Sequence, residues 1–114
     1  MKKTPKDIFS MLQETGLPVA YHHFRVEGDS NTPPTPPFIT WVVDDEADFF
    51  ADNSNYSHIR QISVELYSDL KDFEKEAEIE TLLKSNGLTY TVDYTYINSE
   101  KLYLTIFTFD INFS

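Results

Sequence analysis

The sequence predicts an α+β fold, a mostly antiparallel β-sheet with two helices packed on one face. Two segments place apolar residues at helical spacing, and five others alternate apolar with polar residues or are rich in β-branched and aromatic ones. In chain order they read helix, three strands, helix, two strands (αβββαββ). A length of 114 residues suits one domain with one core, so residues 1–114 are expected to fold as a single unit.

The first helix is expected over residues 5–14. Thr4 is suited to cap the free amides, Pro5 fits the first helical position, and Asp7 places a negative charge in the first turn. Gly16 readily adopts left-handed backbone and is therefore a suitable stop.

The first strand is expected over residues 19–24. Residues 25–37 form a polar connection with four prolines, which is long for a hairpin and predicts either an arm or a binding loop. Residues 38–43 are apolar, β-branched and aromatic around Trp41, which predicts a second strand. Residues 44–55 are acidic and turn-rich.

A third strand and the second helix follow. Residues 56–68 alternate between apolar and polar positions, as a half-buried strand does. Asp69 or Asp72 can open the helix, and Asn86-Gly87 is expected to end it with a left-handed cap. The apolar stripe of this helix is expected to consist of Phe73, Ala77, Ile79, Leu82 and Leu83.

The last two strands are expected over residues 88–96 and 102–111, joined by a turn. The first alternates strictly between apolar or aromatic residues and polar ones. The second is apolar on both faces, which predicts a central position in the sheet.

Composition excludes several classes of function. The chain carries 9 basic and 19 acidic residues, a net charge of −10, so it cannot form the basic face that grips nucleic acid through phosphates. Its 3 glycines are too scattered for a phosphate-binding loop. It contains no cysteine, which excludes disulfides and thiol chemistry, and no segment has the length of apolar sequence that a membrane span requires. No membrane partner is expected.

The sequence gives no positive support for catalysis, and no cofactor or metal site is expected. The acidic run 44–48 has the spacing of a calcium loop, but Phe49 stands where that loop needs glycine. His22 and His23 are neighbours on a strand, so their side chains point to opposite faces and cannot easily hold one ion. The acidic residues Glu74, Glu76, Glu78 and Glu80 are expected to form a solvated face of the second helix.

Aromatic residues make up 15% of the chain, and most lie in strand-like segments. Two interpretations stay open for them: sheet packing beneath the helices, or a partly exposed face that serves a subunit contact. For two phenylalanines in the acidic loop, burial in a neighbouring subunit is an equal alternative. The candidate subunit or partner contacts are Phe49, Phe50, Trp41, Pro36, Pro37, Tyr94 and Tyr96.

Several short segments occur in an order typical of a known family. They are Leu17-Pro18-Val19-Ala20-Tyr21, Pro36-Pro37-Phe38-Ile39, Ala51-Asp52-Asn53 before Tyr56, Val64-Glu65-Leu66-Tyr67-Ser68, and the Leu-Tyr strand near the end. With these landmarks the chain resembles the small prophage "pi2-type" proteins of Gram-positive siphophages, which are similar to tail terminator (tail completion, head–tail joining) proteins. The resemblance covers nearly the whole chain, and residues 25–35 form a longer loop than the family has.

The resemblance implies a structural phage protein with no enzymatic role. Tail terminators are α+β subunits of a homo-oligomeric ring, a hexamer, that caps the head-proximal end of the tail tube. The ring stops polymerisation of the tail tube protein and presents a surface to the head connector protein. DNA passes through without specific binding, and the acidic composition independently fits a lumen that repels phosphates. The implied location is the bacterial host cytoplasm during assembly and the virion tail afterwards.

Two other classes remain as alternatives. An acidic inhibitor of phage origin that imitates DNA would use the 19 carboxylates, spaced like phosphates on one exposed face. A small-ligand module would use Trp41 and the tyrosines to line a pocket.

Overall fold

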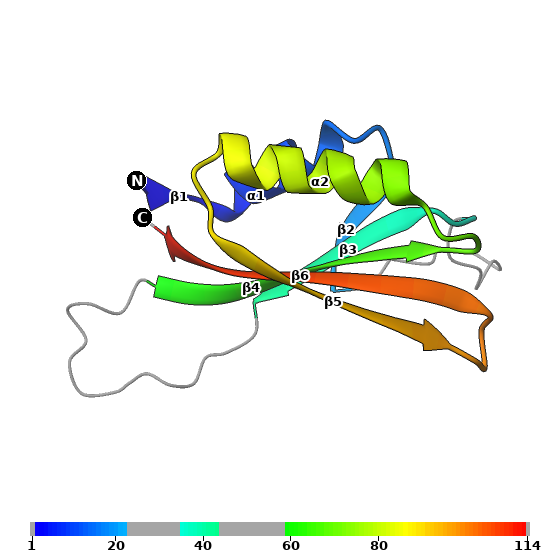
Figure 1. The fold of residues 1–114 in the computed structure, drawn as a ribbon. Coiled ribbons are helices and arrows are strands. Elements are labelled where there is room, and N and C mark those ends of the chain that lie inside the picture. Colours follow the sequence, from blue (N-terminus) through cyan, green and yellow to red (C-terminus); the bar gives the residue numbers. More distant parts are fainter. Residues whose placement is uncertain (1, 23–34, 44–58, 114) are drawn as a thin grey trace, which may run out of the picture.

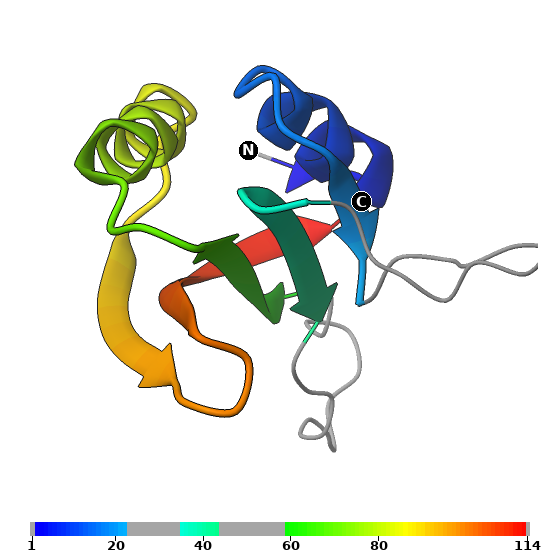
Figure 2. The same cartoon turned by 90° about the vertical axis from the view of Figure 1, so that its right-hand side faces the viewer.

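The computed structural model describes residues 2–22, 35–43 and 59–113 and confirms the α+β fold (Figures 1 and 2). Both helices lie on the same face of one sheet, as predicted (Figures 1 and 2). The helices are α1 (Pro5–Gln13) and α2 (Phe73–Ser85), and the strands are β1 (Lys2–Lys3), β2 (Val19–Tyr21), β3 (Phe38–Val43), β4 (Ile59–Ser68), β5 (Tyr90–Ile97) and β6 (Leu102–Phe113).

Strand β6 occupies the centre of the sheet. One of its sides pairs with β4 in antiparallel register, and the other pairs antiparallel with β5 and, near its end, parallel with β1. The order continues from β4 to β3 and ends at β2. The prediction that the last strand is central is confirmed, because β6 has neighbours on both sides.

Two pairings differ from the hairpins that the sequence suggested. Strand β2 pairs with β3 in parallel, with Val19 opposite Ile39 and Tyr21 opposite Trp41. A parallel pair needs a connection that returns along the strands, usually a dozen residues or more, so the long segment between β2 and β3 follows from this topology. Strand β1 was not predicted, because its two lysines carry no strand signal and it depends on β6 extending as far as Phe113.

The predicted helix caps are confirmed. The Thr4 hydroxyl accepts a hydrogen bond from the Asp7 amide (3.3 Å), and the Asp7 carboxylate accepts one from the Thr4 amide (2.8 Å), which forms a capping box. The Asp72 carboxylate caps α2 by accepting from the Lys75 amide (3.0 Å). After Ser85, Gly87 has a φ of +74°, the left-handed conformation that glycine adopts without strain.

The core lies between the two helices and the helix-covered face of the sheet. The residues of the core cluster are Ile8, Met11 and Leu12 of α1, Ile79 and Leu83 of α2, and Ile39, Trp41, Ile62, Val64, Leu66, Phe107, Phe109 and Ile111 of the strands. Burying one such large side chain contributes roughly 1.5–3 kcal/mol, so this layer is the main source of stability.

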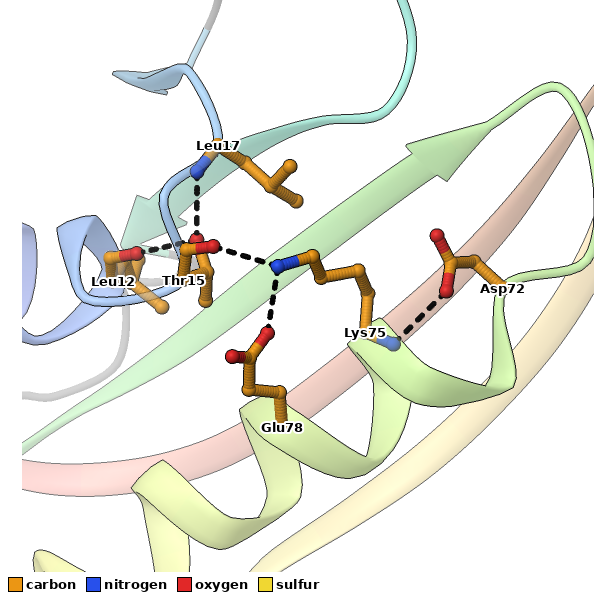
Figure 3. Close-up of polar contacts among 6 residues, drawn as sticks. All are labelled: Leu12, Thr15, Leu17, Asp72, Lys75 and Glu78. Carbon is orange, nitrogen blue, oxygen red and sulfur yellow. Dashed lines mark hydrogen bonds and ion pairs between the residues drawn. The ribbon is translucent and has the colours of Figure 1, made fainter.

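Lys75 ties α2 to the end of α1 (Figure 3). Its ammonium donates a hydrogen bond to the Thr15 carbonyl oxygen (2.8 Å) and pairs with the Glu78 carboxylate (2.8 Å). The buried Thr15 hydroxyl donates to the Leu12 carbonyl (2.8 Å) and accepts from the Leu17 amide (3.2 Å). These bonds fix the position of α2 above the sheet, and α2 forms one wall of the groove described below.

No helix of the described residues covers the opposite face of the sheet (Figure 1). Glu65 lies there and accepts hydrogen bonds from the hydroxyls of Thr40 (2.8 Å) and Tyr67 (3.3 Å). Phe38 stacks on Tyr67 with ring centroids 5.1 Å apart. This face therefore combines satisfied polar groups with the buried ring of Phe38.

Candidate interaction surface

An open groove of about 680 Å³ lies between α2 and the β5–β6 hairpin. We call it the aromatic groove, and it is lined by Lys71, Phe73, Glu76, Ala77, Glu80, Tyr94, Thr95, Tyr96 and Tyr103. It holds more aromatic than charged side chains, which is the composition of protein contact surfaces rather than of solvated ones.

The strand register explains why these aromatic residues are together. Tyr94 lies opposite Thr105 and Tyr96 opposite Tyr103, so all four side chains share the helix-covered face. Helix α2 begins above this end of the hairpin and runs towards Tyr90, which leaves the outer part of the hairpin without cover (Figure 1). Tyr96 and Tyr103 pack edge to face, with ring centroids 4.9 Å apart.

An ion pair between the partly exposed Lys71 and the buried Glu76 forms the floor of the groove. The Glu76 carboxylate accepts hydrogen bonds from the Lys71 ammonium (2.8 Å) and the Thr105 hydroxyl (2.9 Å), and Glu76 is only 5% exposed. The same ammonium lies 4.0 Å from the centre of the Tyr94 ring and 5.5 Å from that of Phe73. The lysine thus positions both aromatic walls through cation–π contacts.

Large apolar side chains at the groove are exposed. Phe73 is 71% exposed and Tyr94 58%, and Leu70, at the approach to α2, is 75% exposed. Single exposed apolar residues are ordinary, but here Phe73 and Tyr94 line one groove. Covering such a surface with another molecule removes apolar area from water, which lowers the free energy of the complex.

Strand β5 also leaves one sheet edge open. In the described part of the chain its only partner is β6, so its outer backbone groups have no strand to pair with. Natural edge strands are commonly protected by lysine, proline or bulges, whereas β5 (YTVDYTYI) contains neither residue and a single charge, Asp93. An edge of this kind favours pairing with another strand.

Two tyrosines have raised pKa values. Burial, followed by the charge of Glu65 and the hydrogen bond to it, raises the pKa of Tyr67 to about 12. Burial, followed by the hydrogen bond to Glu80 (2.7 Å), raises the pKa of Tyr90 to about 12. Both phenols donate to the carboxylates beside them, Tyr67 to Glu65 and Tyr90 to Glu80, and the raised pKa keeps them neutral to a higher pH than an ordinary tyrosine.

The predicted contact residues divide into four groups. Tyr94 and Tyr96 lie in the aromatic groove and are exposed. Trp41 is buried in the core against Tyr21, and its indole N–H finds no acceptor among the described residues. Pro36 and Pro37 are half-buried just before β3, which lies towards the opposite edge of the sheet from β5. Phe49 and Phe50 lie outside the described residues, and their role stays a prediction.

The sequence analysis placed two groove residues wrongly. Phe73 was expected in the core but stands at the groove rim, because α2 buries its other side through Ile79 and Leu83. Glu76 was expected on a solvated face but turns towards the sheet, where Lys71 and Thr105 satisfy it. Helical spacing could not predict either position, because the residues that contact them, Lys71 and Thr105, lie outside the helix.

Residues 2–22, 35–43 and 59–113 bring together no cluster of three or more acidic, histidine or cysteine side chains that could hold a metal ion. No helix among them has the length and hydrophobicity to cross a membrane. Comparison with protein-family models, with curated proteins and with solved structures finds no match for this chain. The surface chemistry of the aromatic groove and β5 is therefore the main structural guide to function.

Proposed function

We propose that this chain is a phage structural protein that assembles with itself into a ring. The ring caps the head-proximal end of the tail tube, ends polymerisation of the tube protein and joins the tail to the head connector. The observation that carries the proposal is the exposed aromatic groove beside an open edge strand. The family resemblance of the sequence landmarks supplies the biological setting.

The groove gives a physical reason for self-association. Aromatic residues are enriched at protein interfaces, and covering one large apolar side chain contributes roughly 1.5–3 kcal/mol. Phe73, Tyr94 and Tyr96 together offer such a contribution from one small surface. An open edge strand adds backbone hydrogen bonds and fixes the orientation of the partner.

Charge supports the passage of DNA through the ring. A net charge of −10 on each subunit repels phosphates, so the duplex can pass through the lumen without being held. Assembly takes place in the cytoplasm of the bacterial host, and the ring stays in the virion tail.

The described carboxylates do not favour the alternative of a DNA mimic. A mimic needs its charges free and spaced on one face, but Glu76 is buried, Glu78 pairs with Lys75, and Glu80 accepts from Tyr90. Glu76 and Glu80 line the aromatic groove, while Glu74 and Glu78 lie on the side of α2 towards α1. The acidic row therefore divides between two sides of the helix.

The growth of tail tubes tests the proposal. Purified tube protein is allowed to polymerise with and without this chain, and tube lengths are measured by electron microscopy. We expect shorter tubes that carry a ring at one end. Tubes of unchanged length without end caps would contradict the proposal.

A further inference from the structure

We propose that neighbouring copies in the ring join through β5 of one copy and β2 of the next, which makes the β-sheet continuous around the ring. The inference rests on the proposed function, because it names the contact by which that ring forms. Its starting point is the position of two open strand edges in the sheet.

Symmetry decides which kind of contact is needed. A cap meets the tail tube on one side and the connector on the other, so its two sides differ and the ring has only a rotation axis. In such a ring each contact joins two different surfaces of the subunit. Pairing β5 with β5 of another copy would make a two-fold contact and cannot generate the ring.

Within the described part of the chain the sheet has two open edges. Strands β5 and β1 share one of them along β6, and β2 forms the other. Among residues 2–22, 35–43 and 59–113, strand β2 (Val19–Tyr21) pairs with β3 alone. The partner of β5 in a ring of identical copies is therefore β2.

Strand directions agree with this pairing. Strand β2 is parallel to β3, and each step from β3 to β4, β6 and β5 reverses direction. Three reversals make β5 antiparallel to β2. When copies repeat side by side with their helices on the same side, β5 meets β2 in the antiparallel arrangement, which has the stronger ladder geometry.

Charge also favours these two edges. Copies with a net charge of −10 repel one another, so contact is least costly where charges are fewest. Strand β2 has no charged residue and β5 has only Asp93. Their pairing therefore places no like charges opposite each other.

The side chain of Tyr21 fits the aromatic groove. Tyr21 lies opposite Trp41 on the helix-covered face of β2, the face that carries Tyr94 and Tyr96 on β5. It is 49% exposed, yet it is held in place by an edge-to-face contact with Trp41 and a hydrogen bond from the Val43 amide to its hydroxyl (3.2 Å). Because these contacts already restrict the Tyr21 side chain, it loses little conformational entropy on binding. Burying its exposed side in the groove of the next copy is therefore favourable.

Disulfide cross-linking tests the pairing, since the natural chain has no cysteine. Ala20 lies on the helix-free face of β2, as do the exposed residues Thr91, Asp93 and Thr95 on β5. Three double variants combine Ala20→Cys with Thr91→Cys, Asp93→Cys or Thr95→Cys. Because the register between copies is unknown, the three positions cover it in steps of two residues. Each variant is first checked for an unchanged melting temperature.

We expect mild oxidation of the assembled protein to give at least one double variant a ladder of covalent oligomers on non-reducing gels, ending at the closed ring. The control pair Ala20→Cys, Glu74→Cys has its second cysteine on the exposed side of α2 and should give no ladder. Covalent dimers of a variant that carries one cysteine on β5 and none on β2 would establish β5–β5 pairing instead and overturn the inference.

Sedimentation velocity of the same samples, with and without tail tubes, separates the two proposals. Assembly without any ladder from the three double variants would overturn the β5–β2 contact and leave the ring standing. A chain that stays monomeric under both conditions would contradict the ring and the contact together.

Discussion

Glu76 is the single residue on which the shape of the aromatic groove depends most. Its carboxylate holds the Lys71 ammonium and the buried Thr105 hydroxyl, and the ammonium in turn lies over the Tyr94 ring. A buried carboxylate is kept only where such partners compensate for its lost hydration. The ion pair therefore organises the surface as well as stabilising the fold.

Substitution of Glu76 tests this role. Glu76→Ala leaves the Thr105 hydroxyl without its acceptor, and since hydrogen bonds to charged groups contribute about 1.5–3 kcal/mol, we expect a loss of about 2 kcal/mol in the free energy of unfolding. Glu76→Gln keeps an acceptor and should lose less. Urea denaturation measures both, and equal stability of Glu76→Ala and the natural chain would contradict the assignment.

The two shifted tyrosines predict a loss of stability at high pH. The pKa values of Tyr67 and Tyr90 rise from 10.0 to about 12 on folding, so their neutral forms are favoured in the folded state. Their contribution is fully present below about pH 10 and is lost as the pH rises through about 12. Tyrosinate absorbance at 295 nm should show two late ionisations in the folded protein, and Tyr67→Phe and Tyr90→Phe should each remove one. Ionisation of all tyrosines near pH 10 without unfolding would contradict the shifts.

At the scale of elements, local signals predicted both helices with their caps, and five of the six described strands at nearly their observed positions. Thr4, Asp72 and Gly87 act where capping rules place them. Long-range pairing was not predictable in the same way, because β1 has no local signal and the parallel direction of β2 depends on where the chain returns to the sheet. The groove shows both outcomes. The alternation of β5 was enough to predict Tyr94 and Tyr96 as contact candidates, whereas the Lys71–Glu76 pair depends on tertiary contacts that no local pattern indicates.

The Lys75 bridge between the helices predicts a modest stabilisation. Lys75→Met keeps helix propensity and the aliphatic stem but removes the bonds to the Thr15 carbonyl and Glu78. Because the ammonium is partly exposed, we expect a loss of about 1 kcal/mol, measured by thermal or urea unfolding. A matched change at exposed Lys84, Lys84→Met, should have little effect, and equal losses for the two variants would contradict the bridge.

Charges placed in the aromatic groove should weaken assembly. The double variant Tyr94→Asp, Tyr96→Asp puts two carboxylates on the surface that we expect to be covered, while both positions are exposed in the single chain. We expect at least a tenfold weaker association, about 1.4 kcal/mol, with little change in melting temperature. The control Gln13→Asp, Thr81→Asp adds the same charge at exposed helix positions outside the groove. Similar association of both variants by sedimentation velocity would show that the groove is not the contact.

At the scale of the whole molecule, net charge and surface chemistry act in opposite directions. A charge of −10 on each copy opposes assembly, while the aromatic groove and the sheet edge favour it. Salt screens the first effect, because the Debye length falls to about 8 Å at physiological ionic strength, and leaves the apolar contact intact. The balance therefore shifts towards assembly as salt is added.

This balance predicts the direction of the salt effect. Raising the ionic strength from about 10 mM, where the Debye length is about 30 Å, to physiological values should strengthen self-association in sedimentation experiments. An acidic inhibitor bound to a basic target would show the opposite, since salt screens attraction between unlike charges. Weaker self-association with added salt would contradict the account of like-charged subunits.

Negative-stain electron microscopy of the purified chain at high concentration tests the ring most directly. We expect closed rings with a central opening, all of one size, and their loss in Tyr94→Asp, Tyr96→Asp while the control Gln13→Asp, Thr81→Asp still forms them. Isolated particles of monomer size, at high concentration and after addition of tail tubes, would contradict the assembly of this chain into a ring.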